Sequence, residues 1–563
     1  MTAIILAAGD DRRMRPLTDQ THKAVLPVGH STILGRILDA LLAASIRDIV
    51  IVTGYRADDV RQYCASTYPD LPVRFVQQDN YDVTGDAGSV ALALTVVPDM
   101  DEALLFGCDA LIDGGVLPSI LSSPPDAVAV SRRRIGLEDW PTVGDHVPIG
   151  IYRLRRSFCE RVIVPHSHGV SLPPLGLSGI ITGAESTVAV VMVGADRWAP
   201  VCSPNQVESA RFHFEPSSRD GILGRTQGAR WNLGITDFEL PRNAHFPTPA
   251  MVEAMRDALP VLMRYGGSSQ QTLNQKLAWH LQCDPERLQV LHGSSQVQPI
   301  FKRIVGTRPV LMPSPLPREY ARQYPSAQTF DDNGAINLDA LHPRVPENGV
   351  VIFVSPNLPT GSVVGTEAML RFAEQHPHTS FIIDESFVDF SDEVPVVSRL
   401  NDEFHPNIVV IKSLSASFGM PGLRLGYIYC QNPELIRVLY DEIPARNISA
   451  QAEHVLELMP AFQDEFAASL ARTKEDRTRF AADLEALDGV GMVHPSGGNF
   501  LMVTLKGDDL GLGALARAQL LDRFSIAVRD VSDAVAPRAP RLCVAVRLPD
   551  ENERFCESLA AVL

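Results

Sequence analysis

The chain has no long hydrophobic run, no Cys-x-x-Cys pair and no excess of positive charge. Its 563 residues carry a formal net charge of −17, which argues against nucleic acid or an anionic membrane as the main partner. No stretch approaches the roughly 18–20 apolar residues of a membrane span. The eight cysteines are scattered, so we expect neither disulfides nor structural zinc. The first apolar run precedes its charged neighbours, unlike a signal peptide, and we therefore expect a cytoplasmic protein.

The length predicts more than one domain, because a single hydrophobic core rarely grows beyond about 250–300 residues. Residues 1–125 alternate short apolar strands with helical patterns such as TILGRILDALLAA at 32–44. This alternation predicts an α/β fold with a mostly parallel sheet covered on both faces. A second α/β alternation begins near residue 231.

A polar stretch rich in Gly and Arg separates the two halves at 211–230 and predicts a domain boundary. The expected domains are 1–222 and 228–563, the latter with a large part at about 260–460 and a small part at about 470–563.

A possible phosphate site follows the first predicted strand, at 4–8. Gly9 stands at the strand-to-turn junction, where the lack of a side chain lets backbone N–H groups approach a triphosphate closely. Arg13 and Lys23 follow in the same segment and could neutralise charge on the phosphates during nucleotidyl transfer.

The whole segment resembles the nucleotidyltransferase signature L-A-A-G-x-G-x-R-L-x-P-L-T-x-x-x-P-K. The residues in register are Leu6, Ala7, Ala8, Gly9, Arg13, Pro16, Leu17, Thr18 and Lys23. Asp11 stands where the second Gly is usual, and His22 where Pro is usual. The resemblance implies a Rossmann-like domain with catalytic Arg13 and Lys23. It also implies nucleotide-binding residues at Leu6, Ala8, Gly9, Gln78, Thr84 and Ser89.

Asp109, at the end of a predicted strand, stands where this family holds Mg²⁺. The alternative is that Asp109 merely caps a turn. The family's closing W-x-E-I-D pattern is altered, because Cys202 replaces the second metal carboxylate after Trp198. A thiol is a poor Mg²⁺ ligand. Either another carboxylate such as Asp196 completes the site, or the domain transfers weakly or not at all.

The second half contains several of the parts that pyridoxal phosphate (PLP) chemistry requires. Residues 293–295 open a helix after a strand and offer N–H donors to a phosphate. Tyr320 could stack on the ring, and Asp384 could pair with the pyridine nitrogen. Arg424 would hold the phosphate, which Tyr265 of a second subunit could also reach.

These residues resemble the fold-type I PLP enzymes close to histidinol-phosphate aminotransferase and threonine-phosphate decarboxylase. The matching segments, in order, are PNLPTG, DESFVDF, KSLSASFGMPGLRLGY, NISAQAE, GGNFLMV and VAVRLPDEN. The resemblance implies a homodimer with its sites between subunits. The cofactor-binding residues that it implies are Gly293, Ser294, Ser295, Tyr320, Asp384, Ser413, Ser415, Arg424 and Tyr265.

The family's Schiff-base lysine is missing. Ala416 stands at its position, eight residues before Arg424, and alanine can neither form a Schiff base nor move a proton. Lys412 is four residues away and is a weak candidate to replace it. Two explanations remain open: an engineered Lys→Ala change that traps a bound adduct, or natural loss.

Two more positions depart from the family. Leu358 replaces the Asn that bonds the cofactor, and Cys543 replaces the Arg that holds the substrate carboxylate. Arg541 and Arg547 share the alternate positions of Cys543 along an extended strand and could hold an anionic group instead. Asn499 is a further substrate-contact candidate by resemblance.

The fusion itself resembles bifunctional enzymes of phosphonate antibiotic biosynthesis. The resemblance implies that the first domain attaches CMP from CTP, with Mg²⁺, to a small phosphonate or phosphate. The second would decarboxylate or transaminate the amino-acid end, using the nucleotide as a remote binding handle. Two alternatives stay open: a nucleotidyltransferase with a catalytically dead PLP-fold scaffold, and a non-catalytic protein that binds nucleotide or PLP.

Overall fold

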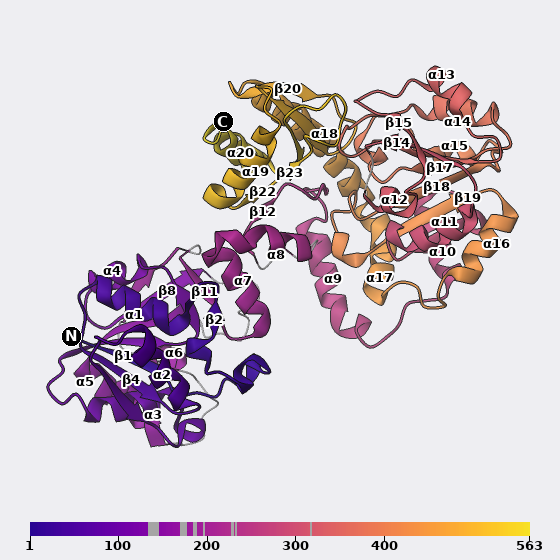
Figure 1. Ribbon diagram of the computed structural model, residues 1–563. Coiled ribbons are helices and arrows are strands. Elements are labelled where there is room, and N and C mark those ends of the chain that lie inside the picture. The colour runs from indigo at the N-terminus through magenta and orange to yellow at the C-terminus, as the bar shows by residue number, and fades with distance from the viewer. Residues whose placement is uncertain are drawn as a thin grey trace. The chain divides into compact units, whose positions relative to one another are not determined.

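The structure is a computed structural model that describes residues 1–132, 146–168, 177–183, 188–194, 197–226, 230, 233–315 and 318–563. The chain divides into two compact units, Met1–Gly234 and Ile235–Leu563 (Figure 1). This division lies a few residues beyond the expected boundary. The reason is that the polar stretch contributes to helices α7 (Pro204–Phe214) and α8 (Arg219–Arg225), and α7 packs Val207 and Ala210 into the core of the first unit.

Within the described residues, seven strands of the first unit form one mixed sheet in the order β10-β8-β9-β6-β1-β4-β5. The strands β5, β4, β1 and β6 run parallel, and β9 is antiparallel to both β6 and β8. The strand bounds are β1 Thr2–Ala7, β4 Ile49–Thr53, β5 Val73–Gln77, β6 Glu102–Gly107, β8 Ala127–Arg132, β9 His146–Arg155 and β10 Ala189–Met192. Short pairs are β2 (Pro27–Val28) with β3 (Ser31–Thr32), and β7 (Ala110–Ile112) with β11 (Trp198–Pro200).

Helices cover both faces of this sheet (Figure 1). Alternate residues of β1 belong to different cores: Ala3 and Ile5 pack with α1 and α2, whereas Ile4 and Leu6 pack with α3. This alternation follows from the two-residue period of a strand. The helix bounds are α1 Ile33–Ala43, α2 Ala57–Thr67, α3 Tyr81–Thr95, α4 Val116–Leu121, α5 Arg156–Phe158 and α6 Leu177–Gly183.

The second unit contains a larger and a smaller sheet. The larger has the order β13-β19-β18-β17-β16-β14-β15, parallel except that β19 opposes both of its neighbours. Its strands are β13 Leu288–Leu291, β14 Val310–Ser314, β15 Gln328–Asp331, β16 Val350–Val354, β17 Ser380–Asp384, β18 Ile408–Ser413 and β19 Gly426–Cys430.

The smaller sheet has the order β20-β21-β24-β23, and a separate short pair joins β12 to β22. These strands are β12 Thr236–Asp237, β20 Val490–His494, β21 Phe500–Leu505, β22 Ile526–Ala527, β23 Arg529–Asp530 and β24 Arg541–Ala545. The helices of the unit are α9 Pro249–Leu262, α10 Gln270–Leu281, α11 Val297–Val305, α12 Arg318–Gln323, α13 Leu338–Leu341, α14 Thr366–Glu374, α15 Val396–Leu400, α16 Pro433–Glu442, α17 Ala450–Leu458, α18 Gln463–Glu485, α19 Gly511–Phe524 and α20 Pro549–Ala560.

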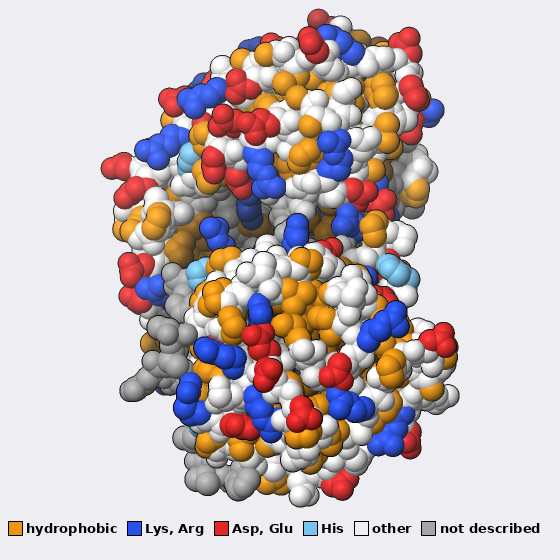
Figure 2. Space-filling model, turned by 90° about the vertical axis from the view of Figure 1, so that its left-hand side faces the viewer, with side chains coloured by type: hydrophobic (Ala, Val, Ile, Leu, Met, Phe, Trp, Pro, Cys, Tyr) orange, Lys and Arg blue, Asp and Glu red, His pale blue; other side chains and the backbone are white. Residues whose placement is uncertain are grey.

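The surface carries charges of both signs. On the face drawn in Figure 2, Lys and Arg side chains are interspersed with Asp and Glu. Among the helices of the described residues, none is both long and apolar enough to cross a bilayer.

Candidate active site

The first unit contains a cavity of about 540 Å³ at the carboxyl ends of β1 and β6. These strands are parallel neighbours, so the residues that follow them, Gly9 and Asp109, line the same cavity. In open α/β sheets the carboxyl ends of the strands are the usual place for a ligand. The volume lies within the range of small-molecule sites.

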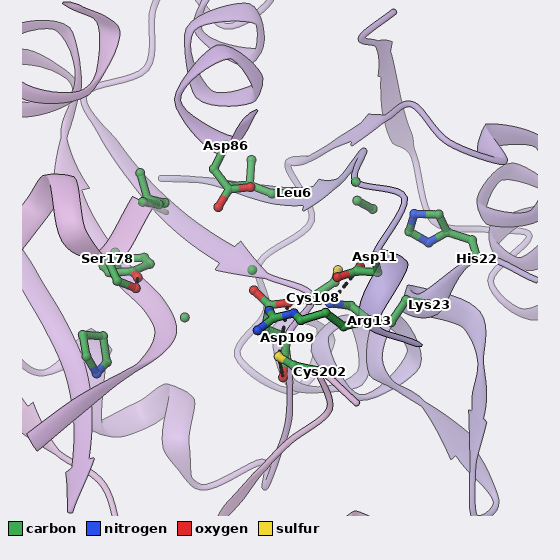
Figure 3. Close-up of a pocket in the computed structure, with 17 residues that line it drawn as sticks. Leu6, Asp11, Arg13, His22, Lys23, Asp86, Cys108, Asp109, Ser178 and Cys202 are labelled. Atoms are coloured by element: carbon green, nitrogen blue, oxygen red, sulfur yellow. Dashed lines mark hydrogen bonds and ion pairs between the residues drawn. The ribbon is translucent and has the colours of Figure 1, made fainter. Parts of the chain in front are cut away.

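Lys23 is the electrostatic centre of this cavity (Figure 3). Its side chain is 3% exposed, and its Nζ lies 2.8 Å from Asp11 Oδ2 and also pairs with Asp109 Oδ1. Burial alone would lower the pKa of Lys23, but the two carboxylates outweigh burial and raise the pKa well above its usual value. Burial also acts to raise the pKa of Asp109, but Lys23 outweighs it, and the pKa of that carboxyl is lowered. The site therefore holds one ammonium between two carboxylates.

Asp11 stands where the signature has glycine, and its backbone adopts the left-handed conformation with φ 41°. In this conformation its carboxylate reaches Lys23 and adds a second negative group beside Asp109. Arg13 lines the same cavity, and its positive charge acts on Asp109. The structure thus brings Gly9, Arg13, Lys23 and Asp109 together, as the sequence predicts.

Cys202 lies beside Asp109. Its Sγ is 3.7 Å from Asp109 Oδ1 and 3.5 Å from the backbone oxygen of Asp109. Burial raises the pKa of the Cys202 thiol, so sulfur is neutral and unsuited to Mg²⁺. The alternative carboxylate, Asp196, lies outside the described residues.

The Lys23 end of the cavity offers two carboxylates, Asp11 and Asp109, to a cation rather than a complete protein cage. In the described part of the chain, no group of three or more His, Cys, Asp and Glu side chains is arranged to hold a metal ion. Mg²⁺ is commonly bound by one or two carboxylates together with substrate phosphates and water. Asp109 and Asp11 fit that arrangement once substrate phosphates approach Lys23.

The predicted base-binding segment folds into one hydrogen-bonded group. Gln78 Nε2 donates to Thr84 Oγ1 at 2.6 Å, and the Ser89 hydroxyl donates to Gln78 Oε1. Leu6 lines the cavity, whereas these three residues and Ala8 are not among its lining residues. Their contact with a nucleotide remains a prediction.

The cavity residues that were not singled out from the sequence include Asp86 of α3, Tyr152 of β9 and Ser178 of α6. They come from three separate elements, and no local motif links them. The one available signal was Asp86, which lies within the segment that contains Thr84 and Ser89.

In the second unit, several predicted cofactor residues meet at the carboxyl ends of β17 and β18. Asp384 ends β17, and its Oδ2 accepts a 2.8 Å hydrogen bond from the Tyr320 hydroxyl. Asp384 Oδ1 accepts hydrogen bonds from the backbone and hydroxyl of Ser386. The Ser386 hydroxyl accepts from the Ser413 backbone N–H, and the Ser413 hydroxyl accepts from the Ser415 N–H. A continuous polar chain therefore joins Asp384 to the residue before Ala416.

A second group surrounds Gly293, whose φ is +72°. Arg424 packs against this glycine so closely that an added Cβ would lie 2.5 Å from Nη2. The same nitrogen donates to Ser295 Oγ at 2.9 Å. Gly293, Ser295 and Arg424 thus present a guanidinium beside a hydroxyl and loop N–H groups, which suits a phosphate.

The side chain of Ser415 indicates that these residues fit PLP. Its hydroxyl is buried and has no partner among the described residues. A buried donor of this kind is costly unless a ligand completes it. Together with Asp384 and Arg424, it fits a phosphorylated ring that is held without a covalent bond at Ala416.

Lys412 lies elsewhere. Its Nζ is 2.6 Å from Asp389 Oδ1, and its side chain is 3% exposed. Asp384 is in register with Ile411. Because neighbouring residues of a strand point to opposite faces, Lys412 faces away from the Asp384 side of the sheet. It is a structural ion-pair residue in this arrangement.

The remaining predicted residues do not converge on Asp384. Arg541 Nη1 donates to the carbonyl oxygens of Val535 and Pro537, each at 2.8 Å. Arg547 donates to Asp237 O and pairs with Glu551.

Asn499 is fully buried, and both of its side-chain polar atoms lack partners in the described part of the chain. Tyr265 is 71% exposed. The substrate roles of Asn499, Arg541 and Arg547 therefore remain predictions, as does the cross-subunit role of Tyr265.

The position of the missing carboxylate anchor is apolar. Cys543 packs with Phe500, Met502, Val531 and Val535, and Leu358 and Phe387 pack against this cluster. Both altered residues, Cys543 and Leu358, thus meet in one hydrophobic group.

The two sites define a chain with a nucleotidyltransferase-like unit followed by a PLP-fold unit. Residues 231–559 match the family described as aminotransferase class I and II, and the chain belongs to that family. Residues 3–275 match the MobA-like NTP transferase domain.

The curated relatives include the CMP-5'-(3-aminopropyl)phosphonate synthase of Streptomyces rubellomurinus. It is 28% identical, with 100% of this chain and 95% of the relative covered. Histidinol-phosphate aminotransferase of Rhodospirillum centenum is 29% identical over 56% of this chain and 87% of its own.

Solved structures show the fold of the second unit. A decarboxylase from Sulfurospirillum multivorans aligns with a TM-score of 0.53 and 21% identity, covering 63% of this chain and 98% of the other. Histidinol-phosphate aminotransferase from Sinorhizobium meliloti, in complex with pyridoxal-5'-phosphate, aligns with a TM-score of 0.51 and 20% identity. Its match covers 61% of this chain and 93% of the other. The α/β fold with a fold-type I unit, expected from the sequence, is thereby confirmed.

Proposed function

We propose that the chain is a two-domain enzyme of phosphonate biosynthesis. The first unit uses CTP and Mg²⁺ to attach CMP to a small phosphonate or phosphate. The second unit binds PLP and the resulting conjugate and acts on its amino-acid end by decarboxylation or transamination. The similarity along the whole chain to a CMP-aminopropylphosphonate synthase supports the pairing of CTP with a phosphonate.

The arrangement of Lys23 with Asp11 and Asp109 is the observation that carries the first half. In the proposed reaction, a phosphonate oxygen attacks the α-phosphorus of CTP, and the bond to the β-phosphate breaks, which releases pyrophosphate. Lys23 and Arg13 stabilise the charge that develops on the phosphates, and Asp109 and Asp11 hold Mg²⁺. Gly9 lets the backbone approach the triphosphate.

The second half rests on the polar chain from Asp384 to Ser415 and on the Gly293–Arg424 contact. PLP, when bound, supplies an electron sink for carbanion chemistry. Asp384 would keep the ring nitrogen protonated, and Arg424 with Ser295 and Ser415 would hold the phosphate. We infer a cytoplasmic homodimer, in part because the apolar side chains of Val261, Met263, Tyr265 and Trp279 are all exposed.

Ala416 favours a second candidate, in which the second unit binds PLP or the conjugate without turning it over. Ala416 supplies no amine, and Lys412 does not replace it because its Nζ pairs with Asp389. Turnover of the conjugate, measured as CO₂ release for decarboxylation and as amino-group transfer to a 2-oxo acid for transamination, separates the two candidates. Wild-type turnover of an amino-acid phosphonate conjugate supports the bifunctional enzyme. Turnover that appears only in Ala416→Lys supports the binding domain.

The test of the first half is pyrophosphate release from CTP and Mg²⁺ with a panel of phosphonates. We expect release that depends on the phosphonate and is abolished by Lys23→Met and Asp109→Asn. The Lys474→Met variant is the control, because Lys474 pairs with Asp392 at the surface of the second unit. If every phosphonate and phosphate tried leaves CTP intact, the proposal fails.

A further inference from the structure

The cavity of the first unit has two chemically different ends. Lys23, Asp11 and Asp109 form the phosphate and cation end described above. Asp86, Tyr152 and Ser178 line the remainder, and Figure 3 shows Asp86 and Ser178 away from the Lys23 group. The mechanism proposed above assigns no task to this second end, so its residues require a separate explanation.

The position of Asp86 is fixed by a break in α3. Gly85 has φ 55° and ψ −153°, which interrupts the helix immediately before Asp86. The backbone N–H of Leu177 donates to the carboxylate and orients it. The Asp86 side chain is exposed and lines the cavity. The aspartate is therefore accessible to a ligand that enters the cavity.

Within the part of the chain that the structure describes, Asp86 has no basic partner in contact. Among the described residues, no salt bridge joins Asp86 to a Lys, Arg or His side chain. The surrounding protein and the charge of Asp109 raise the pKa of Asp86 to about 6. A carboxylate in this setting is stabilised by a cation that enters the cavity, because desolvation and like charge both oppose its ionised form.

The neighbours of Asp86 suit an ammonium group rather than a phosphate. The hydroxyls of Tyr152 and Ser178 lie 2.5 Å apart, and each can accept a hydrogen bond as well as donate one. An alkylammonium group has three donors and no acceptor. A phosphate would be repelled by Asp86 but attracted by Lys23 and Arg13 at the other end. The cavity is therefore polarised for a molecule that is anionic at one end and cationic at the other.

We propose that Asp86 is a specificity-determining residue that binds the ammonium group of an amino-substituted phosphonate acceptor. The inference rests on the proposed cytidylyl transfer and adds the residue that selects acceptors with an amine. The acceptor is a zwitterion whose phosphonate lies at the Lys23 end and whose amine lies against Asp86, Tyr152 and Ser178. An acceptor without an amine loses this contact.

The test compares aminopropylphosphonate with propylphosphonate, which differ only in the amine. Steady-state pyrophosphate release gives kcat/KM, and calorimetry with a non-hydrolysable CTP analogue and Mg²⁺ gives the affinity for each phosphonate. The variants are Asp86→Asn, Asp86→Glu and, as the matched control, Asp82→Asn on the same helix but outside the cavity. Because the proposed hydrogen bond is charge-assisted, Asp86→Asn should weaken the binding of aminopropylphosphonate by about 10- to 100-fold.

In Asp86→Asn, we expect affinity and kcat/KM to fall for aminopropylphosphonate alone. Asp86→Glu should restore part of both quantities, and Asp82→Asn should leave both unchanged. Propylphosphonate should bind weakly to every variant, and CTP-analogue affinity should be unchanged. Equal use of both phosphonates by the wild type overturns the inference but leaves cytidylyl transfer intact. Weakened CTP-analogue binding in Asp86→Asn also overturns it and makes Asp86 a nucleotide contact. Binding of the analogue with neither phosphonate accepted overturns the proposed function itself.

Discussion

Replacing Lys412 by Met tests the assignment of this lysine to the fold and not to the cofactor. The side chain is 3% exposed, and its partner Asp389 is 16% exposed at an N–O distance of 2.6 Å. Removing one member of a buried pair costs about 3–5 kcal/mol, because the other charge stays buried and unpaired. Asp389 retains some contact with water, so we expect the lower end, about 3 kcal/mol, for Lys412→Met.

Differential scanning calorimetry measures this loss as a lower Tm for the transition of the second unit. A destabilisation of about 3 kcal/mol corresponds to roughly 4 °C for a unit of this size. The matched control is Lys474→Met, because the Lys474–Asp392 pair is exposed and should contribute less than about 1 kcal/mol. In the Lys412→Met, Asp389→Leu double variant, the unpaired charge is gone, so part of the stability should return.

The same variant separates the structural role from a catalytic one. Wild-type protein mixed with PLP and reduced with borohydride should gain no covalent mass at Lys412. The reasoning is refuted if such an adduct forms at Lys412, or if Lys412→Met unfolds at the wild-type temperature.

Three further predictions concern the two sites and one buried acid. Cys202→Asp places a carboxylate near the present position of the sulfur, which lies 3.7 Å from Asp109 Oδ1. We expect the apparent Mg²⁺ affinity, measured by titrating pyrophosphate release, to rise by roughly tenfold or more. An unchanged titration would show that Cys202 lies outside the metal site. Gly293→Ala puts a Cβ 2.5 Å from Arg424 Nη2 and should displace the guanidinium. PLP affinity, measured by equilibrium dialysis, should therefore fall by about tenfold. Unchanged affinity would show that Arg424 does not bind the PLP phosphate. Burial raises the pKa of Glu385 to about 7 from 4.5, so the folded state binds its proton more tightly than the unfolded state does. The resulting contribution to the free energy of unfolding is fully present below pH 4.5 and is lost as pH rises through 7. Glu385→Gln should remove this slope from denaturant unfolding curves and add up to about 3 kcal/mol above pH 7, whereas a slope that persists in the variant would assign it to another group.

The fold was predictable where local pattern and tertiary environment agree. The strands β1, β4, β16 and β17 read as continuous apolar runs because parallel strands are buried on both faces. The polar segment at 211–230 includes parts of helices α7 and α8, and the two compact units divide a few residues after it, between Gly234 and Ile235.

The sites were predictable as far as one motif contains them. Lys23 and Asp109 were found by signature and strand end, and they meet in the structure. The contact of Asp11 with Lys23 depends on a left-handed backbone at a position where glycine is usual, which sequence spacing does not reveal. Asp86, Tyr152 and Ser178 come from separate elements, and only the tertiary fold places them in one cavity. Likewise, no sequence pattern predicts the ion pair between Lys412 and Asp389.

The most direct measurement is mass spectrometry with phosphorus NMR of a reaction that contains the wild-type chain, CTP, Mg²⁺ and an aminoalkyl phosphonate. The account predicts pyrophosphate together with a CMP–phosphonate conjugate in equal amounts, and neither product with Lys23→Met. A wild-type reaction in which CTP and phosphonate persist unchanged, although the protein is folded and binds CTP, would contradict it.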